Sequence, residues 1–179
     1  NEGDVPRIHK MGGRDWAKVV TKAKKSIDDL ADKLVEIYAQ REITEGFAFL
    51  PDQPWQQEFE DAFPYEETED QLQATAEIKA SMEKPVPMDR LLAGDVGFGK
   101  TEVAMRAIFK AVMSGKQVAV LVPTTVLAQQ HFQTFWNRFA PFGVKVDVLN
   151  RFRSTSEKKQ VLKGVEDGSI DVLIGTHSL

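Results

Sequence analysis

The eight residues from Gly94 to Thr101 have the composition and spacing of a loop that binds phosphate. They read Gly-Asp-Val-Gly-Phe-Gly-Lys-Thr and fit the pattern of a glycine, four residues, a glycine, a lysine and then a serine or threonine. Glycines let the backbone curl so that successive N–H groups point at phosphate oxygens, and a following helix adds its positive end. We predict that a nucleoside triphosphate is bound by Gly94, Asp95, Val96, Gly97, Phe98, Gly99, Lys100 and Thr101.

Two side chains of this loop have distinct predicted roles. We expect Lys100 to bridge the β- and γ-phosphates and the Thr101 hydroxyl to take one position on Mg²⁺, which makes both candidate catalytic residues. The alternative is a glycine turn in which the Lys-Thr pair is incidental. A strand before the loop and a helix after it favour phosphate binding, and the sequence predicts both.

A glutamine upstream of the loop is a candidate for recognising the base. Gln71 lies 23 residues before Gly94. Its amide both donates and accepts, so it can pair with the N6 and N7 edge of adenine, which predicts a preference for ATP. Phe63 is expected to stack on the purine face. The alternative for Gln71 is an ordinary surface residue at the start of a helix.

Polar side chains follow two predicted strands at the same edge of the sheet. Thr124 and Thr125 come after one strand, and Thr176 and His177 come after another. Hydroxyls and backbone N–H groups at such a position suit a phosphate of a nucleic-acid backbone, and ligands of open parallel sheets bind along this edge. For the two residues at 124 and 125, simple capping of the next helix is the alternative.

Two arginines flank an aromatic residue after a third predicted strand. Arg151 and Arg153 stand on either side of Phe152, and basic residues around an aromatic ring can hold a nucleic-acid strand by charge and stacking. Loop arginines that are solvated or paired at the surface are the alternative interpretation.

Alternating strands and helices must position these groups. Short apolar runs predict strands, and segments of helical period follow them, which indicates a parallel sheet with helical crossovers. The predicted strands are 90–93, 118–122, 144–149 and 171–174, and the predicted helices between them are 101–113, 126–139 and 156–166.

The first part of the chain has a different pattern. From Trp16 to Tyr38 the apolar residues recur in steps of three and four, which predicts one long amphipathic helix whose lysines form a solvated face. Residues 46–70 are aromatic, acidic and interrupted by prolines, so we expect them to pack against another part of the protein rather than to form a long helix. A further helix is predicted over 75–83.

Composition sets broad limits. The 179 residues are 42% apolar, enough for one ordinary core, and the formal charge of −4 does not by itself indicate nucleic-acid binding. The absence of cysteine excludes disulfides and thiolate metal sites and is compatible with a reducing cytoplasm. Because no stretch approaches the roughly 18 to 20 apolar residues of a membrane span, we expect a cytoplasmic protein with no membrane partner.

Together these residues resemble the superfamily 2 helicase core, within the branch that contains RecG and the bacterial transcription-repair coupling factors. Residues 87–104 match the phosphate-loop motif of that branch, which adds Glu102 to the nucleotide site. Residues 123–131, Pro-Thr-Thr-Val-Leu-Ala-Gln-Gln-His, look like its motif Ia, which adds Gln129 to the DNA contacts. Gly175-Thr176-His177 looks like motif Ib.

The resemblance implies an organisation in four parts. Residues 1–12 resemble the tail of an RNA polymerase-interacting domain, 13–45 a long linker (relay) helix, 46–70 a connecting segment, and 71–179 a RecA-like motor domain, incomplete in its sheet. The implied activity is ATP-dependent translocation on double-stranded DNA with Mg²⁺, which displaces stalled RNA polymerase and couples transcription to nucleotide excision repair. RNA polymerase and the excision-repair machinery are the implied protein partners.

Two other functions stay open at this stage. A RecG-like helicase that migrates DNA branches shares much of the pattern, although a wedge-type DNA-binding domain is expected there in place of the helical linker. A nucleotide-regulated binding module without motor activity is the second. The acidic Asp-Glu box of the family is expected shortly after Thr176 and does not occur before Leu179. We therefore expect this chain to bind ATP but not to hydrolyse it efficiently.

Overall fold

The computed structural model describes residues 13–177 and 179, and the chain divides after Glu45 into two compact units. The first unit contains α1 (Arg14–Ile43), a single uninterrupted helix. Its described side chains are almost all exposed, including apolar ones such as Ile27 and Leu34. The predicted amphipathic helix is therefore confirmed as a helix. The tail predicted for residues 1–12 lies outside the described residues.

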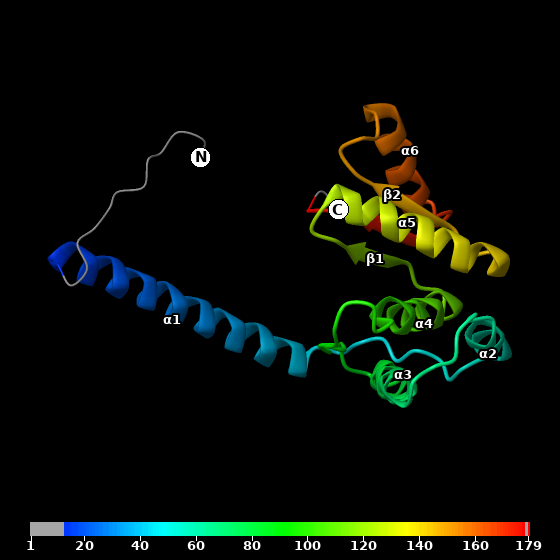
Figure 1. Ribbon diagram of the computed structural model, residues 1–179, viewed down its shortest axis with the longest axis horizontal. Helices are drawn as coiled ribbons and strands as arrows, with labels where there is room; N and C mark the ends of the chain where they lie inside the picture. Colours follow the sequence, from blue (N-terminus) through cyan, green and yellow to red (C-terminus); the bar gives the residue numbers. More distant parts are fainter. Residues whose placement is uncertain (1–12, 178) are drawn as a thin grey trace. The chain divides into compact units, whose positions relative to one another are not determined.

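The second unit is built around a parallel sheet of three short strands (Figure 1). These strands are β1 (Val118–Leu121), β2 (Val146–Leu149) and β3 (Val172–Gly175), and β3 lies between the other two. Leu121 of β1 and Leu149 of β2 both stand opposite Gly175 of β3, so the three strands end level with one another. This sheet confirms the predicted α/β class, and it brings the segments that follow the strands to one edge.

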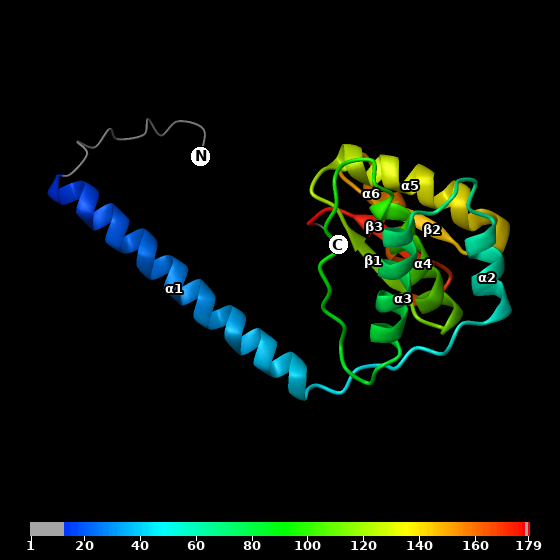
Figure 2. The ribbon, with the colours of Figure 1, turned by 60° about the horizontal axis from the view of Figure 1, so that its bottom comes forward.

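Helices cover the sheet and extend beyond it. The helix α4 (Lys100–Met113) contacts β1, α5 (Thr125–Phe139) contacts β2 and β3, and α6 (Thr155–Glu166) contacts β2. A short 3-10 turn, η1 (Ala140–Phe142), continues from α5. Figures 1 and 2 show α2 (Pro54–Asp61) and α3 (Glu69–Met82) side by side with α4.

Three stacked phenylalanine rings join these helices in the core. Phe59 of α2 stacks on Phe109 of α4, with ring centroids 4.3 Å apart, and on Phe139 of α5, at 5.3 Å. All three side chains are completely buried. Burial of a phenylalanine contributes about 1.5–3 kcal/mol. The aromatic segment 46–70 therefore belongs to the same core as the sheet.

A buried lysine ties the start of this unit to α4. The Lys110 ammonium donates to Asp52 at 2.8 Å, to Glu83 at 2.7 Å and to the Leu50 carbonyl at 2.7 Å. Lys79 of α3 adds a second ion pair to Asp52, at 2.7 Å. A buried charge of this kind is tolerated because each of its donors finds a partner.

One predicted strand does not form. Residues 90–93 run without pairing to any strand among the described residues, and Leu91 is 91% exposed. Arg90 is instead held against α3, where its guanidinium donates to Glu77 at 2.6 Å and to Ser81 at 3.1 Å. The strand prediction is wrong here, because an apolar run forms a strand only beside a hydrogen-bonded neighbour.

The helix predicted over 75–83 begins earlier, at Glu69. The Thr68 hydroxyl accepts the Gln71 N–H at 3.2 Å, and the Gln71 side chain accepts the Thr68 N–H at 3.0 Å. This reciprocal pair is a capping box and fixes the start of α3. Within the described residues, no helix has the length and apolar character needed to cross a membrane.

Candidate nucleotide site and nucleic-acid groove

The phosphate loop bends through two glycines before α4 begins. Gly97 and Gly99 have φ angles of 87° and 71°, in the left-handed region that residues with a Cβ rarely adopt. Gly99 caps α4, and its carbonyl accepts the N–H groups of Glu102 and Val103 at 2.9 and 3.4 Å. The positive end of α4 therefore lies at the loop, where it favours an anion.

The side chain of Lys100 folds back over this loop. Its ammonium group donates to the carbonyl oxygens of Gly94 and Asp95, at 2.6 Å in each case. The loop thus holds the cation where the predicted phosphates would bind. Phosphate oxygens are stronger acceptors for an ammonium than neutral carbonyls are, so these two bonds can be exchanged when an anion is present.

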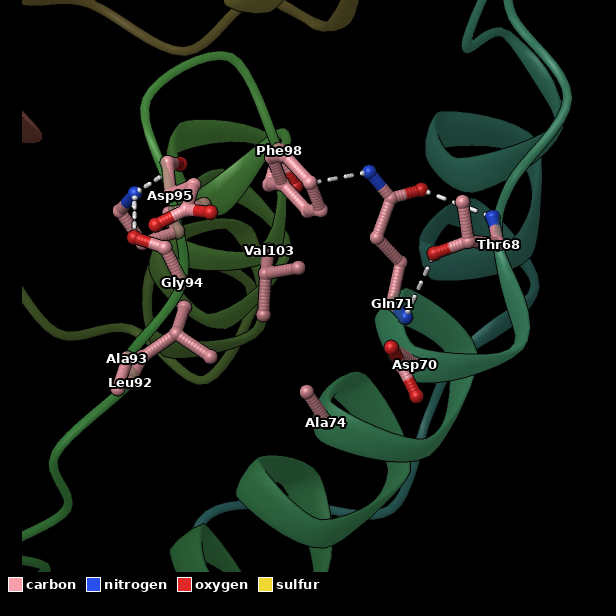
Figure 3. Close-up of a pocket in the computed structure, with 11 residues that line it drawn as sticks. Thr68, Asp70, Gln71, Ala74, Leu92, Ala93, Gly94, Asp95, Phe98 and Val103 are labelled. Carbon is pink, nitrogen blue, oxygen red and sulfur yellow. Dashed lines mark hydrogen bonds between the residues drawn. The ribbon is translucent and has the colours of Figure 1, made fainter.

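Gln71 connects α3 to the phosphate loop. Its side-chain NH₂ donates to the carbonyl of Phe98 at 3.1 Å, while its oxygen is engaged by the N–H of Thr68 (Figure 3). These two backbone partners set the orientation of the amide, because the Phe98 carbonyl can only accept and the Thr68 N–H can only donate. A primary amide has two hydrogens and two oxygen lone pairs, so one of each is left over from these bonds. The remaining N–H can donate to N7 of adenine, and the remaining oxygen lone pair can accept from the N6 amino group.

The loop and α3 enclose a cavity of about 450 Å³, within the usual range for small-molecule sites. Its residues fit a triphosphate, because they combine an ammonium group, a helix N-terminus and a cradle that a Cβ on Gly99 would fill by striking the Gln71 amide. Mg²⁺ would be held by the Thr101 hydroxyl and by phosphate oxygens, on which this ion usually relies. The cavity is lined by Thr68, Asp70, Gln71, Ala74, Leu92, Ala93, Gly94, Asp95, Phe98, Lys100 and Val103.

Two predicted nucleotide ligands have side chains directed elsewhere. The Glu102 carboxylate is buried between Arg106, at 3.2 Å, and Arg138, at 2.9 Å. Phe63 lies under the Arg106 guanidinium, 5.5 Å from the ring centroid, and packs edge-on against Tyr65. These contacts keep both side chains out of the lining of the nucleotide cavity. Their roles toward a nucleotide stay predictions that this arrangement does not support.

A second hollow, which we call the groove, lies at the edge where the strands end. It measures about 420 Å³. The sheet brings together five of the predicted nucleic-acid residues there, because the segments that follow β1, β2 and β3 meet at that edge. The groove is lined by Pro123, Thr124, Thr125, Arg151, Lys158, Thr176 and His177.

The remaining two predicted contacts do not line the groove. Arg153 is paired with Asp147, whose carboxylate oxygen lies 2.5 Å from the guanidinium. Gln129 is exposed on α5. Thr124 combines both proposed roles, since it lines the groove and its hydroxyl also caps α5 by accepting the Leu127 N–H at 3.2 Å.

Sequence reasoning missed three polar lining residues. Thr68 and Asp70 belong to the nucleotide cavity, and Lys158 belongs to the groove. The threonine three residues before a glutamine was a visible signal, because that spacing is the capping-box pattern. No local pattern marks Lys158, since its approach to the groove depends on how α6 packs.

Comparison with known proteins places these features in a family. A family model described as DEAD/DEAH box helicase matches residues 68–179. The chain is 53% identical over 179 residues to the transcription-repair-coupling factor of Bacillus subtilis, and 55% identical over 177 residues to that of Mycobacterium bovis. These matches cover 100% and 99% of the chain, which spans 15% and 14% of the two relatives.

A solved structure matches as well. The structure of RecG bound to a three-way DNA junction superimposes with a TM-score of 0.76 at 39% sequence identity. The match covers 80% of this chain and 20% of the RecG chain. The resemblance inferred from the motifs is therefore confirmed at the level of sequence and of fold.

Proposed function

The chain belongs to the DEAD/DEAH box helicase family, and we propose that it is the ATP-binding part of a motor that moves along double-stranded DNA. The observation that carries this proposal is the hydrogen bond from the Gln71 side chain to the Phe98 carbonyl of the phosphate loop. It supports the proposal because the Gln71 amide, which can donate to and accept from adenine, lies beside the loop proposed to bind phosphates. A nucleotide would therefore join α3 to the N-terminus of α4.

Three side chains of the nucleotide site have distinct proposed roles. Lys100 exchanges its two carbonyl partners for β- and γ-phosphate oxygens, the Thr101 hydroxyl binds Mg²⁺, and Gln71 selects adenine. Mg²⁺, when bound, neutralises charge that develops on the phosphates. The loop glycines allow the close approach of the backbone.

We further propose that the whole protein displaces stalled RNA polymerase and couples transcription to excision repair in the cytoplasm. The support is that the two coupling factors match along essentially the whole chain, including the segment of α1. The RecG structure covers 80% of it at lower identity. A RecG-like branch-migrating helicase is the second candidate, favoured by that structural match alone.

We expect the 179-residue chain to turn over ATP slowly by itself. Phosphoryl transfer requires the metal, the attacking water and a transition-state cation to be placed together. The phosphate loop contributes the phosphate cradle, Lys100 and the Thr101 hydroxyl as one ligand for the metal. Steady-state phosphate release by the purified chain, with and without duplex DNA, measures this directly.

The test of the proposed function is nucleotide selectivity by calorimetry. We expect MgATP to bind more tightly than MgGTP, and Gln71→Ala to remove that difference, because the amide reads the adenine edge. Gln73→Ala is the matched control, since Gln73 lies on the same helix and its side chain donates to Glu77, at 2.9 Å, away from the cavity lining.

Equal affinity for the two nucleotides in the unmodified chain would exclude adenine recognition by Gln71. A loss of selectivity in both glutamine variants would show that α3 acts only as a scaffold. No nucleotide binding by a folded chain would refute the proposed function.

A further inference from the structure

The cation side of the groove contains a lysine that no motif marks. Lys158 lies in the first turn of α6, half-buried, and lines the groove together with Arg151. Side chains on a helix lean toward its N-terminus, so Lys158 leans toward the loop that carries Arg151. Both basic residues belong to the segment that follows β2, and both line the groove.

The acidic groups nearby in the sequence are engaged elsewhere. Asp147 is paired with Arg153, and the Glu157 carboxylate accepts the Ser154 N–H at 2.7 Å as part of the capping box of α6. Among the residues that the structure describes, no carboxylate lines the groove. Within the described part of the chain, the Lys158 ammonium has no hydrogen bond or ion pair. Its positive charge is thus available to an anion from solution.

The opposite side of the groove is formed by hydroxyls. Thr124 and Thr125 open α5, whose N-terminus adds a partial positive charge, and Thr176 follows β3. A groove with cations along one side and hydroxyls with a helix end along the other suits a phosphodiester, which has negative oxygens and no donors. A bare carboxylate ligand would use only part of this set.

We propose that Lys158 is a phosphate contact that acts with Arg151 to hold one phosphodiester of a double-stranded DNA backbone against the threonine hydroxyls. This inference rests on the proposed function and extends it, because it assigns a DNA contact that lies outside the recognised motifs. The contact is to the backbone, so it supplies affinity and register without sequence preference.

The test is the salt dependence of binding to a fluorescent 20-base-pair duplex, with the full 179-residue chain. Each phosphate contact contributes about 0.9 to the slope of log K against log salt. Lys158→Ala should lower the slope by about 0.9 and weaken binding about eightfold at 0.1 M salt, equally for unrelated sequences. Lys158→Arg should keep the slope. Lys159→Ala, the adjacent exposed lysine that does not line the groove, should behave as the unmodified chain.

A second measurement does not depend on affinity. Acetylation with acetic anhydride, followed by mass spectrometry, should show Lys158 protected by bound duplex and Lys159 unprotected. Circular dichroism establishes that each variant is folded.

The outcomes separate the inference from the function on which it rests. An unchanged slope in Lys158→Ala, or the same loss in Lys159→Ala, overturns the assignment of Lys158 but leaves DNA binding intact. Protection by RNA or single-stranded DNA but not by duplex overturns the assignment to double-stranded DNA. No duplex binding by the unmodified chain overturns both the inference and the proposed DNA activity.

Discussion

At the scale of single residues, the nucleotide site depends on the fit between Gly99 and Gln71. The glycine has a left-handed backbone and leaves room for the glutamine amide, which reaches across to the Phe98 carbonyl. A methyl group at Gly99 would strike that amide. Gly99 therefore has three roles. It allows the left-handed turn of the backbone, it caps α4, and it leaves space for Gln71, which we propose recognises the base.

Alanine substitutions at the two loop glycines separate these effects. Both positions have positive φ, so each alanine should cost about 1 kcal/mol of stability. A Cβ on Gly97 meets open space, whereas a Cβ on Gly99 displaces Gln71. We expect Gly99→Ala to weaken ATP binding at least about tenfold, the loss of roughly one hydrogen bond, and Gly97→Ala to weaken it less. Calorimetric titration with MgATP compares them, and equal losses would contradict this account.

At the residue scale, the sequence is most informative where the functional groups are contiguous. The loop from Gly94 to Thr101 leads directly into α4, as its pattern predicts, although residues 90–93 before it pair with none of the described strands. Pairing of Gln71 with adenine stays a prediction. Its bond to the Phe98 carbonyl joins residues that are 27 positions apart, and the sequence did not predict it. Lys158 illustrates the limit, because a lone lysine has no pattern until packing places it.

At the scale of elements, α4 is the centre of the second unit. Its first turn meets the phosphate loop, and its second half contributes Phe109 to the core and Lys110 to the ion pairs. Burial alone would lower the pKa of Lys110, but the hydrogen bonds that its ammonium donates to Asp52 and Glu83 outweigh burial and raise the pKa. Burial likewise opposes ionisation of Asp52, yet its bonds to Lys110 and Lys79 lower the pKa of that carboxyl.

The lowered pKa of Asp52 predicts a dependence of stability on pH. Its stabilising contribution is fully present above the ordinary pKa of 3.8 and is lost as pH falls through the lower folded-state value. Asp52→Asn should reduce the free energy of unfolding by about 1 kcal/mol at pH 7, a figure discounted because the side chain is 39% exposed. The difference from the unmodified chain should shrink toward pH 3.

Urea unfolding at the two pH values measures this difference. Asp61→Asn is the control, since Asp61 is exposed and its carboxylate accepts from Gln57 within α2, at 2.7 Å. A loss from Asp52→Asn that is the same at pH 3 and pH 7 would show that the carboxylate charge is irrelevant.

Element type was predictable from hydrophobic period, whereas pairing and exact starts were not. The strands 118–122, 144–149 and 171–174 appear with ends shifted by one or two residues. Residues 90–93 have the composition of a strand but pair with none of the described strands, and Arg90 is drawn to α3 instead. Whether an apolar run forms a strand depends on which strands lie beside it in the fold, and the local sequence does not specify those strands.

At the scale of the whole molecule, the chain consists of a lone helix and an α/β unit that has its own core. Both clusters of buried apolar residues lie between Phe49 and Ile174, within the second unit. The nucleotide cavity and the groove are also formed there. We therefore expect residues 46–179 to contain the structural requirements for nucleotide binding.

Removal of residues 1–45 tests this expectation. The shortened chain should unfold cooperatively with a midpoint within about 2 °C of the full chain, because less than 1 kcal/mol of core stability should be lost. Its affinity for MgATP should be unchanged. Differential scanning calorimetry and nucleotide titration report the two quantities, and a shortened chain that fails to fold would mean that α1 contributes to the core of the second unit.

The most direct test of the central claim, that ATP binds at the phosphate loop, is titration of a fluorescent ATP analogue with Mg²⁺ into the full chain and its Lys100→Ala variant. Lys84→Ala is the control, because Lys84 is an exposed lysine outside the cavity. We predict saturable binding by the full chain and by Lys84→Ala, and a loss of at least about tenfold in Lys100→Ala, since a charge-assisted bond to phosphate is removed. Equal affinity in all three proteins would contradict the assignment of this loop as the nucleotide site.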